Sequence, residues 1–372
     1  MTSIVRLTLA LSCAYLISGC TSIGVGTILR DRPAYNEVIA DTWKQQTLLN
    51  IVKLRYFDTP TFLDVSSVIS SYQLHGELSF EREFFPRAPS DTNRTTGIGG
   101  SYTDRPTISY APLTGERFVN NLLRPIPPQA VFAMVMAGHQ ADFILRVTVR
   151  SINDVYTYTG ARNRARGEDP AFPDVVDALQ RLQRIGALGM RVEERRISDD
   201  EAQDRGRRDR VRREYVTWVF FRDTHSERAR TDIALLRRAL ALAPDAREFR
   251  LTFGALHSEG NEIALFTRSI LEILVELSAG VDVPETHAAE GRVRAIAPAS
   301  VDNASAYPVA RIQSSSTRPE DAFAAVYYRN HWFWIDDRDL PSKRMFTFLK
   351  LFSSIAETGV APQLPVLTVP AN

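Results

Sequence analysis

Three aspartates near the carboxyl end, Asp336, Asp337 and Asp339, form the densest group of carboxylates beside aromatic residues in the chain. Carboxylate oxygens are the ligands that Mg²⁺ and Ca²⁺ prefer, so one interpretation is a site for a hard cation. The other is a turn between a strand and a helix, in which Asp339 caps the helix and its neighbours are solvated. The sequence places no further acidic residue to complete a coordination shell. We therefore favour the turn and predict no metal site.

Side chains that could serve acid–base or nucleophilic catalysis are present but lack a recognisable spacing. The six histidines show neither the i, i+4 pairing of a helical zinc motif nor an HExxH sequence. The serines show no GxSxG and no SxxK pattern, although a triad assembled from distant segments would leave no such trace. The glycines of residues 97–100 lack the strand and helix that frame a phosphate-binding loop. We therefore predict no catalytic residue and no cofactor, and favour a protein that is not an enzyme.

Aromatic residues near the carboxyl end could contact a ligand. Tyr327 lies before Arg329-Asn330 and Trp332 and Trp334 lie after it, and this pattern predicts a β-hairpin with a two-residue turn. The register of such a hairpin places Tyr327 opposite Trp332, and Ala325 opposite Trp334. Buried rings would form the core of the hairpin, whereas exposed rings would stack on a sugar or a partner. Tyr327, Trp332 and Trp334 are therefore our candidate partner or glycan contacts.

The composition is that of a globular chain with balanced charge. The chain has 372 residues, of which 44% are hydrophobic and 24% charged, enough to form one large domain or two ordinary ones. Lys and Arg number 45 against 44 Asp and Glu. A net charge of +1 gives no reason to expect nucleic acid as a partner. The arginine-rich run at residues 205–213 could meet lipid phosphates, but a solvated loop is the simpler interpretation.

Helical and strand-like patterns alternate along the chain. Short spacers and hairpin signals favour an α+β fold over a parallel doubly wound sheet. One such signal predicts a hairpin between the two strands within residues 249–266. We expect a mixed or mainly antiparallel sheet with packed helices, and a C-terminal aromatic hairpin followed by a helix. Helical patterns cover residues 33–58, 114–123, 128–136, 175–185, 226–240, 267–278 and 340–355. Strand patterns cover residues 61–85, 107–110, 145–149, 190–197, 215–221, 249–256, 262–266, 323–328, 331–336 and 364–369.

Composition also indicates how the chain divides. Residues 34–155 form an N-terminal α+β region, in which residues 86–106 are rich in Pro, Ser, Thr, Asn and Gly and predict a long loop. Residues 172–372 form a C-terminal α+β region. The two regions could also be one continuous domain.

The first twenty residues carry an export pattern. Arg6 is followed by an apolar stretch at residues 7–17, which is too short to remain as a membrane-spanning helix, and then by Ser18-Gly19-Cys20. This layout resembles the signal peptide and lipobox of bacterial lipoprotein precursors. The alternative is an ordinary secretory signal, or a buried N-terminal helix, with a chance cysteine.

The resemblance to lipoprotein precursors implies a cellular location. It implies that residues 1–19 are a signal peptide removed before Cys20, that Cys20 carries acyl chains such as palmitate, and that residues 20–33 are a lipid tether. Two acyl chains suffice for stable membrane anchoring. Thr21 stands where an aspartate would imply retention in the inner membrane. The expected location is therefore the outer membrane of the cell envelope, with the protein facing the periplasm.

Several stretches are similar to those of uncharacterised bacterial lipoproteins, a resemblance that implies location and no activity. They are LLNIVKLRY with the following FDTPTFLDV, ISYAPLTGER, and residues 327–343. Our leading hypothesis is a lipid-anchored, non-enzymatic scaffold or partner-binding component, in which residues 61–110 contact an envelope protein. One alternative is a glycan- or peptidoglycan-binding module that uses the tryptophan hairpin. The other is a hydrolase that acts on envelope polymers.

Overall fold

The computed structural model divides into two compact units, one comprising Met1–Lys44 and Thr61–Leu113, the other Gln45–Pro60 and Thr114–Asn372. Each unit combines helix with strand, so the fold is α+β, as predicted. No helix in the described ranges is both long and apolar enough to cross a bilayer. The expected signal peptide, Cys20, residues 205–211 of the arginine-rich run and the expected strand at residues 364–369 lie outside the described ranges, whereas Arg212 and Arg213 begin a strand and not a loop. The structure describes residues 23–69, 72–82, 94–104, 107–157, 168–197, 212–222, 225–255, 260–293 and 310–356.

The first helix in the described ranges, α2 (Ile23–Arg55), is longer than the sequence pattern indicates. It begins at Ile23 and continues through Pro33, where we expected it to start. Part of the expected tether at residues 20–33 is therefore helical. The glycines suggested a flexible segment, but glycine is only weak evidence against a helix. Its role as a tether stays a prediction.

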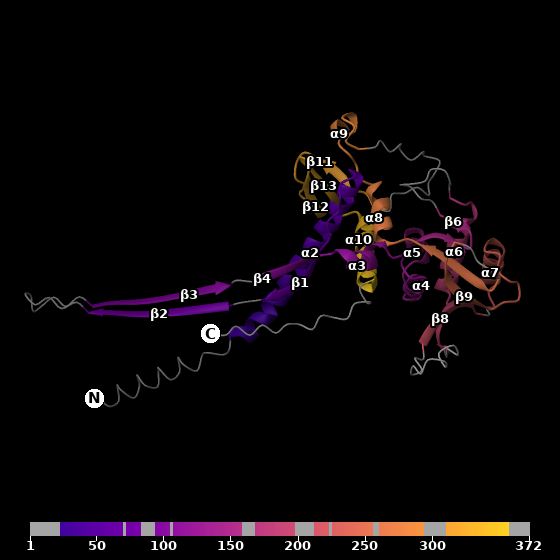
Figure 1. Ribbon diagram of the computed structural model, residues 1–372, viewed down its shortest axis with the longest axis horizontal. Coiled ribbons are helices and arrows are strands. Elements are labelled where there is room, and N and C mark those ends of the chain that lie inside the picture. The colour runs from indigo at the N-terminus through magenta and orange to yellow at the C-terminus, as the bar shows by residue number, and fades with distance from the viewer. Residues whose placement is uncertain are drawn as a thin grey trace, which may run out of the picture. The chain divides into compact units, whose positions relative to one another are not determined.

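The first unit contains two antiparallel pairs of strands, and Figure 1 shows one of them, β2–β3, as a long ribbon. The long loop expected at residues 86–106 is wrong for residues 94–104, which form a strand in continuous register with β2. Glycine and threonine in this segment suggested turns, but pairing with a neighbouring strand overrides such local preferences. The two pairs are β1 (Leu63–Ile69) with β4 (Thr107–Pro112), and β2 (Tyr72–Arg82) with β3 (Arg94–Asp104).

The second unit is built on a six-stranded sheet in the order β6-β5-β10-β9-β8-β7. Its pairs are antiparallel except β9–β10, which is parallel, so the hairpin expected within residues 249–266 is wrong. β9 and β10 lie side by side in the sheet. On its other side, β9 pairs antiparallel with β8, and β10 pairs antiparallel with β5. The strands are β5 (Val149–Ile152), β6 (Val155–Tyr156), β7 (Leu188–Ile197), β8 (Arg212–Phe221), β9 (Glu248–Phe253) and β10 (Glu262–Thr267).

Four consecutive helices of the second unit pack in a row, each against the next. The strand expected at residues 145–149 is wrong, because helix continues to Thr148 and β5 begins at Val149. Ala141, Ile144 and Leu145 are buried at helical spacing, and this period outweighs the short alternation that suggested a strand. The helices are α4 (Pro128–Met136), α5 (Ala141–Thr148), α6 (Ala171–Arg184) and α7 (Glu227–Ala239).

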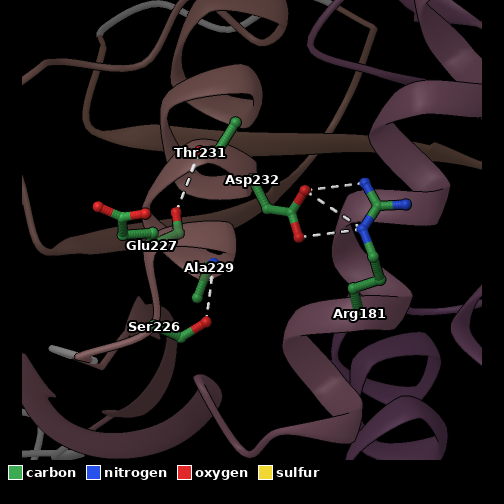
Figure 2. A network of polar contacts seen from close by, with 6 residues as sticks. All are labelled: Arg181, Ser226, Glu227, Ala229, Thr231 and Asp232. Atoms are coloured by element: carbon green, nitrogen blue, oxygen red, sulfur yellow. Dashed lines mark hydrogen bonds and ion pairs between the residues drawn. The ribbon is translucent and has the colours of Figure 1, made fainter.

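An ion pair joins α6 to α7. Figure 2 shows the Arg181 guanidinium facing the Asp232 carboxylate, to which Nη2 donates at 2.8 Å and Nε at 3.0 and 3.2 Å. In the same view, the Ser226 hydroxyl accepts a hydrogen bond from the backbone N–H of Ala229 at 3.4 Å and so caps α7, as predicted.

A second, three-stranded antiparallel sheet in the order β11-β13-β12 carries the candidate site. The predicted hairpin is confirmed, with Tyr327 opposite Trp332 and Ala325 opposite Trp334. The third strand, β11, falls in a serine run that the sequence did not mark as a strand. The strands are β11 (Gln313–Ser315), β12 (Ala322–Tyr328) and β13 (His331–Asp336); the remaining helices are α3 (Gly115–Phe118), a π-helical turn (Val119–Leu123), α8 (Ile270–Ser278), α9 (Glu285–Ala289) and α10 (Leu340–Ala356).

Candidate functional site

The three-stranded sheet has one buried face and one partly exposed face. Phe333 and Ile335 of β13 are fully buried, and they lie beside Val326 and Ala324 of β12, which are also buried. Because successive side chains of a strand point to opposite faces, these residues define the core face. The intervening positions lie on the other face, which we call the aromatic face.

The aromatic face holds all three candidate contact residues. Tyr327 is 56% exposed, and Trp332 and Trp334 are half-buried. The rings of Tyr327 and Trp332 are tilted by 54°, with centroids 5.3 Å apart. The indole Nε1 of Trp334 is buried and has no hydrogen-bond partner in the described part of the chain. The structure therefore brings the three predicted residues together on one surface that is partly exposed to solvent.

Polar groups border this surface. The Arg318 guanidinium lies over the Trp332 ring, 5.4 Å from its centroid. Within the described ranges, no carboxylate lies at ion-pair distance from Arg318. On β11, Ser315 is the register partner of Trp332, and Gln313 is that of Trp334. The aromatic face thus combines ring surface with a hydroxyl, an amide and a cation.

The three aspartates at the end of β13 form a turn and a helix cap. Asp339 accepts hydrogen bonds from the backbone N–H of Ser342 at 3.1 Å and from its hydroxyl at 2.6 Å, which confirms the predicted cap of α10. Asp336 accepts a backbone hydrogen bond from Arg338 at 2.8 Å, and Asp337 pairs with Lys343 at 2.7 Å. Among the residues that the structure describes, no group of three or more His, Cys, Asp or Glu side chains could hold a metal ion.

A polar cluster that the sequence did not indicate lies against the core face. Tyr56, near the end of α2, is buried, and its hydroxyl lies 2.7 Å from Nδ1 of His287 in α9. The His287 ring meets that of His331 edge to face, with centroids 4.9 Å apart. Tyr56 also contacts the rings of Tyr328 and Phe333 edge to face. The cluster therefore joins α2, α9 and the β12–β13 hairpin.

The surroundings of His287 favour the neutral form of its ring. Burial is the largest cause that lowers the pKa of His287 below its usual value, and the positive charges of His331, Arg292 and Arg329 act in the same direction. Burial raises the pKa of Tyr56. A neutral imidazole beside a protonated phenol suits a hydrogen bond from the Tyr56 hydroxyl to Nδ1 of His287.

An ion pair between Arg329 and Asp58 lies beside the cluster, at the hairpin turn. The Tyr328 hydroxyl donates to the Asp58 carboxylate, and Arg329 Nη2 donates to it at 2.9 Å. The hydrogen bond from Tyr328 lowers the pKa of Asp58, and the hydrogen bond and charge of Arg329 lower it further. The same guanidinium lies 5.1 Å from the centroid of the Tyr56 ring. Together these contacts hold the turn to the end of α2.

The cluster and the aromatic face lie on opposite sides of the same strand. His331 belongs to the core face with Phe333, whereas Trp332, Trp334 and Asp336 occupy the alternate positions of β13. No spacing could have revealed the cluster, because 231 residues separate Tyr56 from His287. Lipid attachment at Cys20 stays a prediction, because that residue lies outside the described ranges.

Comparison with known proteins gave no relative: no family model, no curated protein and no solved structure matches the chain.

Proposed function

We propose that this protein is a lipid-anchored component of the bacterial cell envelope, held at the outer membrane by acyl chains on Cys20, and that it binds a glycan without acting as an enzyme. The lipobox pattern supports the location. The observation that supports the binding function is the aromatic face. There the rings of Tyr327 and Trp332 contact each other on the side of the sheet that faces away from the core.

The chemistry of this face suits a sugar. A sugar ring is apolar on its C–H faces and polar at its edges, and Tyr and Trp offer an apolar body beside a polar tip. The Gln313 amide and the Ser315 hydroxyl stand on the neighbouring strand, where they could meet sugar hydroxyls. The contact of Arg318 with Trp332 is worth only about 0.5–1 kcal/mol at an exposed site. A ligand could therefore displace the guanidinium, or pair with it through an acidic group.

The test is a titration of the detergent-solubilised full chain with a tetrasaccharide of N-acetylglucosamine and with soluble peptidoglycan fragments, followed by tryptophan fluorescence. We expect saturable binding that Trp332→Ala weakens by roughly tenfold or more, as for an aromatic residue at the centre of a binding surface. Tyr215→Ala is the matched control, because Tyr215 is 59% exposed in β8 of the other sheet. No saturable change with either probe, or an equal loss in the control, would contradict the glycan function.

A scaffold that binds an envelope protein is the second candidate function. The β2–β3 ribbon favours it, because both strands lack a further partner strand among the described residues. Unpaired strand edges can accept a strand from another chain. Repeated purification of the full chain from solubilised membranes without a reproducible envelope protein would count against this function.

A further inference from the structure

Arg318 is the cation beside the rings of the aromatic face, and it differs from the other arginines of the three-stranded sheet. Its side chain is exposed, and its guanidinium lies 5.4 Å from the centroid of the Trp332 ring. Within residues 310–338, every other arginine pairs with a carboxylate, whereas Arg318 pairs with none in the described part of the chain. These pairs are Arg311 with Asp282 at 3.8 Å, Arg329 with Asp58 at 2.9 Å, and Arg338 with Asp321 at 2.8 Å.

The acidic residues around Arg318 do not neutralise it. Asp321 pairs with Arg338, and Glu320, which is exposed, makes no ion pair with any residue that the structure describes. Asp336 shares the aromatic face with Trp332, but it lies four residues further along β13, which corresponds to about 13 Å of strand. The positive charge beside Trp332 is therefore open to a negative group on a ligand.

Another arginine shows how such a contact is completed inside the protein. The Arg191 guanidinium lies 5.9 Å from the centroid of the Trp218 ring, and it also donates to the Glu248 carboxylate at 2.6 Å. The donors of a guanidinium lie in its plane, so the group can lie over a ring and bind a carboxylate at the same time. The aromatic face offers the ring and the cation, but no carboxylate of the described residues binds Arg318.

The hydrogen-bonding groups of this face also suit an acidic sugar. A guanidinium can only donate hydrogen bonds and a carboxylate can only accept them, and bonds between the two are charge-assisted. On β11, the Ser315 hydroxyl donates to the carbonyl of Thr317 at 2.5 Å, which leaves its oxygen as an acceptor for a sugar hydroxyl. A carboxylate on Arg318 and a hydroxyl on Ser315 would thus both find the partner that they need.

We propose that the aromatic face binds a sugar that carries a carboxylate, with the sugar ring on Trp332 and Tyr327 and the carboxylate on Arg318. This inference rests on the glycan-binding function proposed above and names the class of glycan. Two sources have this chemistry, a polymer of uronic acids and the muramic acid of the bacterial cell wall where its carboxylate is free. A neutral glycan, or carboxylates without a sugar ring, would leave part of the face unused.

The first test compares two tetrasaccharides that differ chiefly in charge, tetragalacturonate and its fully methyl-esterified form. Each is titrated into the detergent-solubilised full chain, and calorimetry gives the dissociation constant. We expect the acid to bind roughly five- to tenfold more tightly than the ester, as for a charge-assisted hydrogen bond at a partly exposed site. This preference should shrink when the salt concentration rises from about 0.05 to about 0.5 M, because salt screens exposed charges. Equal affinity of acid and ester would overturn the proposal and leave the glycan function standing.

The second test assigns the preference to Arg318. Arg318→Gln should leave acid and ester with equal affinity. Arg191→Gln is the matched control, because it removes the guanidinium that contacts a tryptophan of the other sheet, and it should keep the preference for the acid. Both side chains are exposed, so both variants should melt within about 2 °C of the parent chain. A preference that survives Arg318→Gln, or that both variants lose equally, would contradict the role of Arg318.

Further ligands separate the two sources and test the need for a sugar. Tighter binding of the disaccharide of N-acetylglucosamine and N-acetylmuramic acid than of digalacturonate would assign the cell wall as the source, and the reverse would assign a polyuronate. A tetraglutamate peptide carries carboxylates without a sugar ring, and it should bind more weakly than tetragalacturonate. Equal binding of the peptide would overturn the proposal. If no sugar, acidic or neutral, binds the chain, the glycan function fails together with this inference.

Discussion

At the scale of single residues, His287 links stability to pH. Its pKa in the folded chain is lowered by burial, and then by the charges of His331, Arg292 and Arg329, with Glu290 opposing them. The unfolded chain keeps the usual pKa of about 6.5, so it binds the proton first as the pH falls. The stability that the neutral His287 contributes is therefore fully present above that value, and it declines as the pH falls toward the pKa of the folded state.

We predict that the free energy of unfolding decreases as the pH falls below about 6.5, with at most about 1.4 kcal/mol per pH unit from His287. His287→Gln keeps a polar partner for the Tyr56 hydroxyl but removes the titration, so its pH dependence should be flatter. Urea unfolding at several pH values measures this. His139→Gln, at an exposed position, is the control and should follow the parent chain. An equal slope in the parent chain and His287→Gln would refute the role of His287.

At the scale of elements, the pair Arg181–Asp232 fixes α6 against α7. The Asp232 side chain is 8% exposed and that of Arg181 is 35% exposed, so water reaches only one partner. We predict that Asp232→Asn lowers the free energy of unfolding by about 1–3 kcal/mol. The loss should be smaller than for a fully buried pair, because Arg181 can be resolvated. Denaturant unfolding measures the change. Asp245→Asn, on an exposed turn, should stay within about 0.5 kcal/mol of the parent, and a similar loss in both variants would contradict this account.

Prediction of elements from sequence succeeded where local chemistry decides the structure. The two-residue turn Arg329-Asn330 sets the register of its hairpin, and both residues adopt the positive φ that such a turn requires. Prediction failed where distant segments decide. The direction of β10 relative to β9 depends on its pairing with β5. The apolar residues of α5 fit both a strand pattern and a helix pattern. No local signal resolves the direction of β10.

The candidate site divides in the same way. Residue type and hairpin register were enough to nominate Tyr327, Trp332 and Trp334 and to place them on one face. The Tyr56–His287 contact depends on how α2, α9 and the hairpin pack together, which periodicity does not encode.

At the scale of the whole molecule, the proposed function depends on the chemistry of Cys20. The chain has two cysteines, and Cys13 lies in the segment expected to be removed with the signal peptide. A lipid-anchored protein needs two acyl chains or a comparable second signal for stable attachment, because a single chain binds membranes only marginally. Loss of the acylated thiol should therefore release the mature chain.

We predict that Cys20→Ser moves the protein from the membrane pellet to the soluble fraction and abolishes labelling with radioactive palmitate. Cys13→Ser should leave both unchanged, because that residue is cleaved away. Inhibition of the lipoprotein signal peptidase should cause the uncleaved precursor to accumulate. Ultracentrifugation and mass spectrometry of the N-terminal peptide measure these outcomes. A Cys20→Ser chain that remains in the pellet unlabelled would show that another feature holds the protein at the membrane, and would remove the support for its proposed location.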